Sequence, residues 1–107
     1  MKRGEIWTVA GGVYASKPRP AVILQADVFD QTGSVTVVPF TTDPTEAPLF
    51  RLELAPDAVN GLRTPCRIMV DKITTVPRAN LGLLVGQLGQ EDMLRLNRAT
   101  VAFLGIV

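Results

Sequence analysis

Hydrophobic positions recur with two different periods, and the change of period divides the chain into two parts. Up to about residue 88 the apolar residues alternate with polar ones or form short β-branched runs, which is typical of strands. This pattern predicts strands over residues 5–10, 21–25, 34–41, 49–54, 67–76 (one or two strands) and 82–88. From Gln90 the spacing becomes helical, which predicts a C-terminal α-helix with one apolar face. That face is formed by Met93, Leu96, Asn97, Thr100, Val101 and Leu104.

Prolines and glycines mark where these segments end. Pro39 cannot donate a hydrogen bond to a neighbouring strand, so the strand over 34–41 should bend or reach a sheet edge there. Before the second strand, Pro18 and Pro20 bracket Arg19 in a predicted loop. Each proline fixes its own φ and favours an extended residue before it. Arg19 is therefore expected at a loop-to-strand junction in a restricted conformation.

The order of elements predicts a mainly β (α+β) architecture. Six or so short strands followed by one helix indicate a curled antiparallel sheet or small β-barrel with the helix packed against it. The chain has 107 residues, which leaves no room for a second hydrophobic core. We therefore expect a single domain over residues 1–107.

Composition excludes several kinds of site. The chain has no histidine and only one cysteine, Cys66, which argues against a zinc site, an intramolecular disulfide and a ribonuclease that uses paired histidines. The formal net charge is +1, so any binding to nucleic acid must come from a local basic patch. The N-terminus lacks the apolar core of a signal peptide, and no apolar run approaches the roughly 18 residues of a membrane span. A cytoplasmic protein without membrane contact is expected.

Five segments, in order and over essentially the whole chain, resemble the MazF/PemK family of toxins. They are residues 2–7 (KRGEIW), 18–24 (PRPAVIL), 37–42 (VVPFTT), 70–76 (VDKITTV) and 85–88 (VGQL), ahead of the helix. The resemblance implies an SH3-like antiparallel β-barrel with a C-terminal α-helix, the fold of MazF-like and CcdB-like toxins. It also implies a homodimer that cleaves single-stranded RNA at short sequences without metal or cofactor. Messenger RNA is the expected target, with ribosomal and transfer RNA as further candidates. The implied partner is a MazE-like antitoxin whose C-terminal segment covers the RNA groove.

Two residues match catalytic positions of that family, namely Arg19 in the Arg-Pro element and Thr41 at the end of the third strand. A guanidinium is suited to the charge that develops on phosphate oxygens, because its planar donors meet two oxygens at once. One such donor is worth about 2.7–4 kcal/mol in comparable oxyanion sites. We expect Arg19 to hold the scissile phosphate and Thr41 to orient or stabilise the same group. Arg19 is not assigned as a base, because its pKa lies above about 12.

Further candidates for substrate binding lie in the loops. Tyr14, Ser16 and Lys17 are candidates for stacking on bases and contacting phosphate, and Thr42 and Asp71 are added from the matching segments. Each has a plainer interpretation, as a solvated loop residue or, for Asp71, as a residue that completes a turn. The first loop also departs from the family, because it is short and lacks the glutamate found in many members. Its contribution to substrate choice is therefore open.

Two other functions remain alternatives. CcdB-like toxins share the fold but inhibit DNA gyrase by protein contact, using aromatic residues at the end of the last helix. This chain ends FLGIV without a terminal tryptophan. A non-catalytic SH3-like binding module would need a groove with several aromatics, whereas the aromatic content is 6%.

Overall fold

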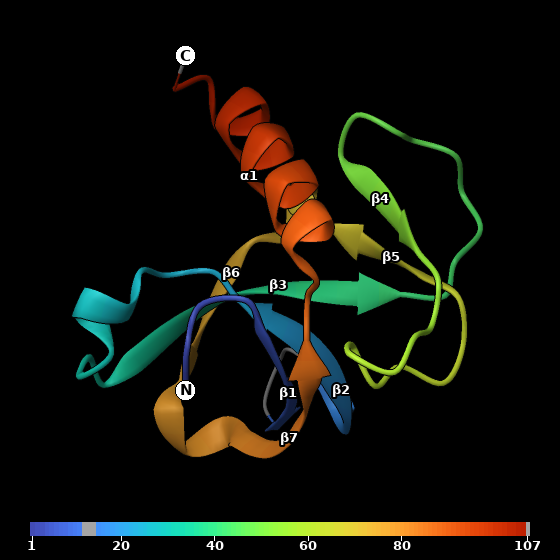
Figure 1. Cartoon of the computed structure of the whole chain (residues 1–107). Helices are drawn as coiled ribbons and strands as arrows, with labels where there is room; N and C mark the ends of the chain where they lie inside the picture. Colours follow the sequence, from blue (N-terminus) through green and yellow to red (C-terminus); the bar gives the residue numbers. More distant parts are fainter. Residues whose placement is uncertain (12–14, 107) are drawn as a thin grey trace.

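The computed structural model of the chain describes residues 1–11 and 15–106, and the side chains at 11, 15 and 16 lie outside that description. Seven strands precede one helix (Figure 1). The strands are β1 (Glu5–Gly11), β2 (Ala15–Ile23), β3 (Ser34–Thr41), β4 (Arg51–Leu54), β5 (Cys66–Met69), β6 (Thr74–Pro77) and β7 (Leu81–Gln87), and the helix is α1 (Gln90–Leu104). Short 3-10 turns cover Asp27–Phe29 (η1), Val70–Lys72 (η2) and Arg78–Asn80 (η3).

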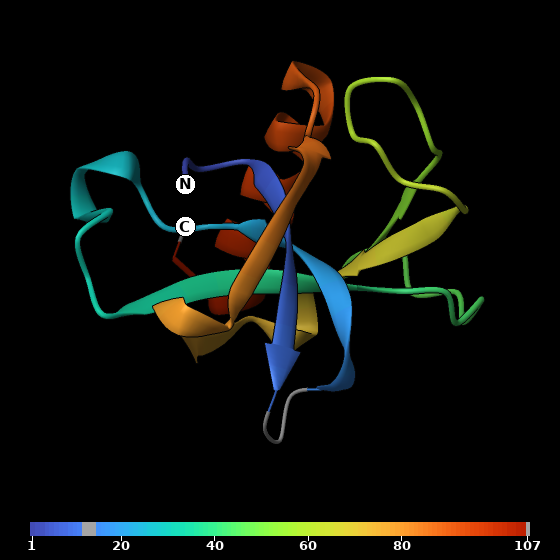
Figure 2. The same cartoon turned by 90° about the horizontal axis from the view of Figure 1, so that it is seen from below.

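The strands form one curled antiparallel sheet. Their order is β4-β5-β3-β2-β1-β7, and β6 pairs with β3 beside this path. Seen from below, β1 and β7 run across the direction of β3, which shows how strongly the sheet curls (Figure 2). The predicted mainly β architecture with one C-terminal helix is confirmed.

The strand β2 differs from its prediction, because it begins at Ala15 and includes the whole Pro18-Arg19-Pro20 element. Arg19 is paired with Val9 of β1, and Pro20 with Thr8. The ladder from β2 to β3, by contrast, is recorded only from Ala21 to Ile23. Residues before Ala21 therefore pair on one side, and a sheet edge is where prolines are tolerated in a strand. The loop predicted around Pro18 and Pro20 is thus corrected: residues 15–20 form the first part of a strand.

The strand β3 has the predicted bounds, and it changes partner next to Pro39. Its residues Ser34–Val37 pair with β6, while Phe40 and Thr41 pair with β5. Between these two ladders lies Pro39, whose missing N–H matters least where the neighbour changes. The sequence predicted a bend or a sheet edge at Pro39, whereas the structure has a continuous strand whose neighbour on one side changes there. Strand β4 is shorter than predicted, because residues 48–50 form a turn before it.

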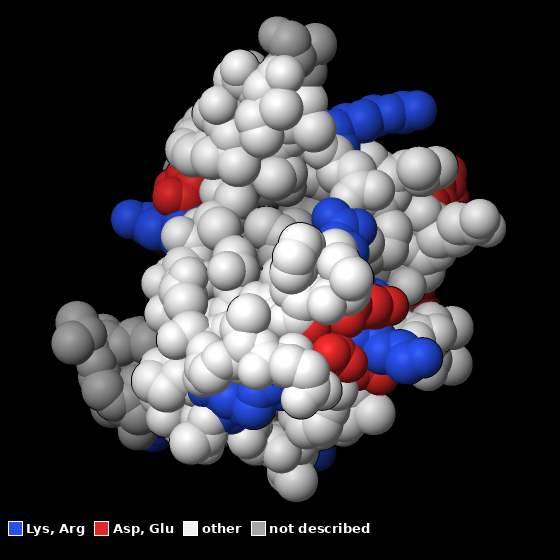
Figure 3. Space-filling model, turned by 90° about the vertical axis from the view of Figure 1, so that its left-hand side faces the viewer, with Lys and Arg blue, Asp and Glu red and all other residues white. Residues whose placement is uncertain are grey.

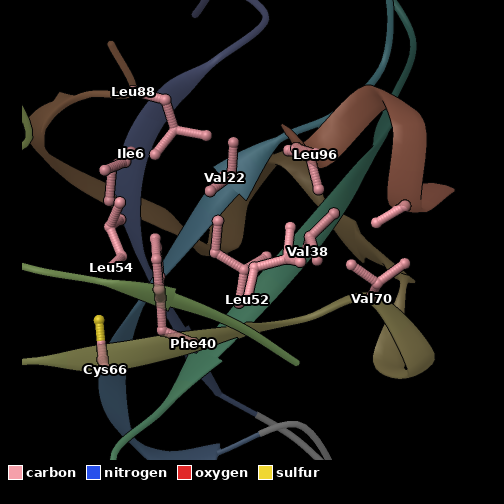
Figure 4. Packing of buried hydrophobic residues seen from close by; sticks show 12 residues of the cluster. Ile6, Val22, Val38, Phe40, Leu52, Leu54, Cys66, Val70, Leu88 and Leu96 are labelled. Carbon is pink, nitrogen blue, oxygen red and sulfur yellow. The ribbon is translucent and has the colours of Figure 1, made fainter. Parts of the chain in front are cut away.

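Buried side chains fill both faces of the sheet. The main cluster lies between the sheet and α1, and its members converge from strands far apart in sequence (Figure 4). It consists of Ile6, Val22, Val38, Phe40, Leu52, Leu54, Cys66, Ile68, Val70, Leu88, Leu96 and Ala99. The second cluster lies on the opposite face of the central strands and comprises Val9, Ala21, Ile23, Val35, Val37 and Val76. Alternation along β2 and β3 divides their residues between the two clusters, which fixes the register of the sheet.

The helix α1 packs on the main cluster through residues between 93 and 99. Leu96 and Ala99 are buried, and Met93 packs against the main cluster. Leu104, predicted on the apolar face, is instead 53% exposed, because the C-terminal end of α1 extends beyond the sheet (Figure 1). Within residues 1–11 and 15–106, no helix is long and apolar enough to cross a membrane.

Candidate active site

A cleft of about 650 Å³ opens where β2, the end of β3, β7 and the segment before β5 meet. It is lined by residues 18–20, 40–42, 61–64 and 83–85, together with Thr8 and Cys66. These segments are distant in sequence and are brought together by the curl of the sheet. The cleft is therefore a product of the fold.

Arg19 and Thr41 line this same cleft. The register between β2 and β3 explains why: Ala21 is paired with Pro39, and the ladder is antiparallel. The ladder ends at this pair, and Arg19 and Thr41 each lie two residues beyond it, on strands that are neighbours up to that point. The two residues assigned to catalysis from the sequence therefore share one cleft.

The hydroxyl of Thr41 is oriented by its own backbone. Its oxygen accepts a hydrogen bond of 3.1 Å from the N–H of Asp43. This bond uses a lone pair and leaves the hydroxyl proton available to donate to a bound anion. Thr42, which is exposed, lines the cleft beside it.

The lining carries positive charge and hydroxyl groups. Among the described residues that line the cleft, the charged side chains are Arg19 and Arg63, and no aspartate or glutamate is present. The face shown in Figure 3, in comparison, intersperses acidic and basic side chains among wide uncharged areas. A local site of this kind suits a polyanion despite a net charge of only +1. No role was predicted for Arg63, which follows Asn60 and Gly61 in the segment between β4 and β5.

The other predicted substrate-binding residues are placed differently. Asp71 is not among the cleft residues: its carboxylate binds Arg51, with the Arg51 Nε 2.7 Å from one oxygen and Nη2 3.0 Å from the other. The Arg51 guanidinium lowers the pKa of the Asp71 carboxyl through these hydrogen bonds. Asp71 therefore completes a partly buried ion pair and is not carried into the proposed site. Lys17 is exposed and precedes the lining residue Pro18. Tyr14 and the side chain of Ser16 lie outside the described residues.

Cys66 lines the cleft, but its thiol is unsuited to nucleophilic chemistry. Burial raises the pKa of the Cys66 thiol to about 11, because desolvation disfavours the thiolate. Cys66 also belongs to the main hydrophobic cluster. Cys66 is therefore a buried core residue. In the part of the chain that the structure describes, no three Cys, Asp or Glu side chains gather in a way that would hold a metal ion.

Comparison with known proteins decides the family. Residues 2–104 match the family of PemK-like, MazF-like toxins of type II toxin–antitoxin systems. The chain belongs to this toxin family. A probable endoribonuclease MazF from Mycolicibacterium smegmatis is 53% identical over 107 residues, which cover 99% of this chain and 98% of the relative. Endoribonuclease MazF3 of Mycobacterium tuberculosis is 38% identical over 77 residues, covering 67% of this chain and 68% of the relative.

Solved structures of MazF toxins have the same fold. A mycobacterial endoribonuclease in complex with its cognate antitoxin superposes with a TM-score of 0.83 at 21% identity, covering 100% of this chain and 97% of that one. Mycobacterium tuberculosis toxin MazF-mt6 superposes with a TM-score of 0.80 at 27% identity, covering 94% and 96%. The expected MazF-like toxin and its fold are confirmed, and the names of the relatives agree with the expected endoribonuclease activity. The two alternatives, a gyrase inhibitor and a non-catalytic module, are not favoured.

Proposed function

We propose that this MazF-like toxin is an endoribonuclease that cleaves single-stranded RNA in the cleft shared by Arg19 and Thr41. The observation that carries the proposal is the convergence of a guanidinium and an oriented hydroxyl on one cleft, with no carboxylate among the described lining residues. Cleavage of RNA places extra negative charge on a phosphate, and the guanidinium and hydroxyl donors can stabilise that charge. A carboxylate at the same place would repel the phosphate.

The proposed reaction is an internal transesterification. The 2′-hydroxyl of the RNA loses its proton and attacks the adjacent phosphorus, so that an O2′–P bond forms. The P–O5′ bond breaks, and the departing 5′-oxygen takes up a proton. Between these events the non-bridging oxygens carry extra negative charge. Arg19 stabilises that charge through paired N–H donors, and Thr41 donates its free hydroxyl proton to the same group.

The chemistry needs no bound metal or cofactor in this proposal, because the nucleophile belongs to the substrate. The guanidinium supplies the charge stabilisation that a metal ion gives in other nucleases. Thr42, at the cleft, and Lys17, at its margin, are proposed to contact the RNA on either side of the scissile group. Tyr14 and Ser16 stay predictions for substrate binding.

The toxin is proposed to act in the cytoplasm with two protein partners. One is a MazE-like antitoxin whose C-terminal segment covers the cleft; a relative of the same fold has been solved with its cognate antitoxin. The other is a second copy of the toxin. Exposed apolar side chains at the end of α1, namely Phe103, Leu104 and Ile106, support a partner surface of that kind.

The test replaces Arg19 with alanine and, separately, with lysine. Removing one preorganised donor is expected to lower kcat by about 10²–10³-fold, and lysine should restore little, because it lacks the planar pair of donors. The matched control is Arg98→Ala, which removes the same charge from the exposed surface of α1. The measurement is cleavage of a mixed pool of single-stranded RNA, with new 5′ ends mapped by sequencing. Retained cleavage by a folded Arg19→Ala variant would remove Arg19 from the mechanism.

Expression in a growing bacterium separates this proposal from gyrase inhibition. Rapid loss of RNA integrity, absent with Arg19→Ala, supports the nuclease. DNA breaks with intact RNA would contradict it.

A further inference from the structure

Most arginines of this chain are already engaged by protein groups, and the exceptions are concentrated in the cleft. Within the described residues, five of the eight arginine side chains have hydrogen-bonding partners: Arg3, Arg51, Arg67, Arg78 and Arg95. The three without a recorded partner there are Arg19, Arg63 and Arg98. Two of these, Arg19 and Arg63, line the cleft. Two like charges on one lining repel each other, and a bound anion relieves that repulsion.

The segment that carries Arg63 is rigidly built. Asn60 is 1% exposed, and it is the one polar residue that is buried among the residues the structure describes. Its side-chain oxygen accepts hydrogen bonds of 3.0 Å from the N–H groups of Asp57 and Leu62, and its side-chain nitrogen donates one of 2.9 Å to the carbonyl oxygen of Ala55. One buried amide thus ties together three backbone positions on both sides of the turn.

The same segment is docked on β7, the strand that forms another wall of the cleft. The N–H of Gln87 donates a 3.0 Å hydrogen bond to the carbonyl oxygen of Val59. Gly61 has a φ of +67° and approaches β7 so closely that a Cβ on it would lie 2.2 Å from the carbonyl oxygen of Val85. A segment held in this way presents Leu62, Arg63 and Thr64 to the cleft without having to be ordered by the ligand.

We propose that residues 55–65 form a second, preformed phosphate-binding element of the toxin. Arg63 holds a phosphate next to the scissile one in the RNA backbone, and Asn60 is the positioning residue that fixes Arg63 in the cleft. The inference rests on the proposed function, in that RNA is the ligand of the cleft. It adds a substrate-binding residue from a different element, so that consecutive phosphates are held by Arg19 and Arg63.

The first experiment measures binding without cleavage. A mixed-sequence single-stranded RNA, 2′-O-methylated throughout, lacks the nucleophile and stays intact. Its Kd is measured by fluorescence anisotropy over a series of salt concentrations. Each phosphate contact contributes about 0.7 to the slope of log Kd against log salt for single strands. Arg63→Ala is expected to reduce the slope by about that amount and to weaken binding about tenfold at low salt. Arg63→Lys should retain the slope, and Arg98→Ala is the matched control and should leave the slope unchanged.

The second variant tests the positioning role of Asn60. Asn60→Ala is expected to reduce the salt slope as Arg63→Ala does, with the double variant no worse than Arg63→Ala alone, because both changes remove one contact. A merely structural role would lower the melting temperature and leave the slope as it is in the folded protein. If Asn60→Ala fails to fold, Arg63→Ala and Arg63→Lys still decide whether Arg63 binds phosphate.

Cleavage kinetics separate this inference from the proposed function. Arg63→Ala should raise KM about tenfold with kcat within twofold, because a contact to a non-reacting phosphate is made equally in the ground and transition states. If the wild type cleaves RNA, Arg19→Ala does not, and Arg63→Ala behaves as Arg98→Ala does, the inference on Arg63 is overturned and the function stands. A wild-type protein that neither binds nor cleaves RNA overturns both.

Discussion

A substitution at Gly61 tests how closely residues 55–65 pack on β7. Two separate penalties oppose a side chain there. The backbone has a φ of +67°, in the left-handed region, and a Cβ would meet the Val85 carbonyl oxygen at 2.2 Å. The atom in the way belongs to the backbone of β7, so it cannot move aside as the end of a flexible side chain would. Gly61→Ala must displace either the turn or the strand.

The magnitude follows from these two penalties. A left-handed conformation costs about 1–2 kcal/mol for a residue with a Cβ. Forcing extra volume into a packed region typically costs about 1–3 kcal/mol. We therefore expect Gly61→Ala to lower the free energy of unfolding by about 2–5 kcal/mol. For a domain of this size, 1 kcal/mol corresponds to a melting shift of roughly 4–8 °C.

Two other glycines isolate the terms. Gly105, which ends α1, has a φ of +69° but nothing within 4 Å of the added Cβ, so Gly105→Ala shows the conformational penalty alone. Gly33 also has open space and does not have a positive φ, so Gly33→Ala should be neutral or stabilise by about 0.4–1 kcal/mol. The assay is urea unfolding at one fixed protein concentration, because the proposed self-association would make stability depend on concentration. A loss for Gly61→Ala no larger than that for Gly105→Ala would refute the proposed packing of the segment on β7.

Three further predictions concern the core and the ionisable groups. Leu96→Ala should lower the free energy of unfolding by about 2–5 kcal/mol, because Leu96 is fully buried. In the same denaturant assay Leu94→Ala, on the exposed side of α1, should change it by no more than about 0.5 kcal/mol. Equal effects of the two substitutions would contradict the orientation of α1 in the structure. Asp71→Asn removes the ion pair with Arg51. Because the folded pKa of Asp71 is lowered, the pair stabilises the protein above the unfolded pKa of about 3.9 and ceases to do so as pH falls through the folded pKa. The stability gap between wild type and this variant should therefore close in acid, and a gap that persists there would argue against the pair. With its pKa raised to about 11, the buried Cys66 thiol should react slowly with a disulfide reagent at pH 8 until urea unfolds the chain, and prompt reaction of the folded protein would contradict its burial.

The sequence by itself determined the kinds of element and most of their order. Hydrophobic periodicity located β3 and α1, and Pro39 marked where β3 changes partner, because these signals depend on residues close together in the chain. Residue chemistry and the family resemblance also identified Arg19 and Thr41. Both fall in the cleft of the structure.

Tertiary structure alone decided which distant residues share that cleft. Arg63 joins Arg19 because Asn60 closes the turn of its segment and Val59 accepts a hydrogen bond from Gln87 of β7, and no local pattern reports contacts of that kind. Asp71, in the turn η2, is absent from the cleft lining, and Arg51 of β4 binds its carboxylate. Such outcomes depend on which backbones the curled sheet brings side by side. Periodicity describes one segment at a time, whereas a site assembled from several segments depends on their packing.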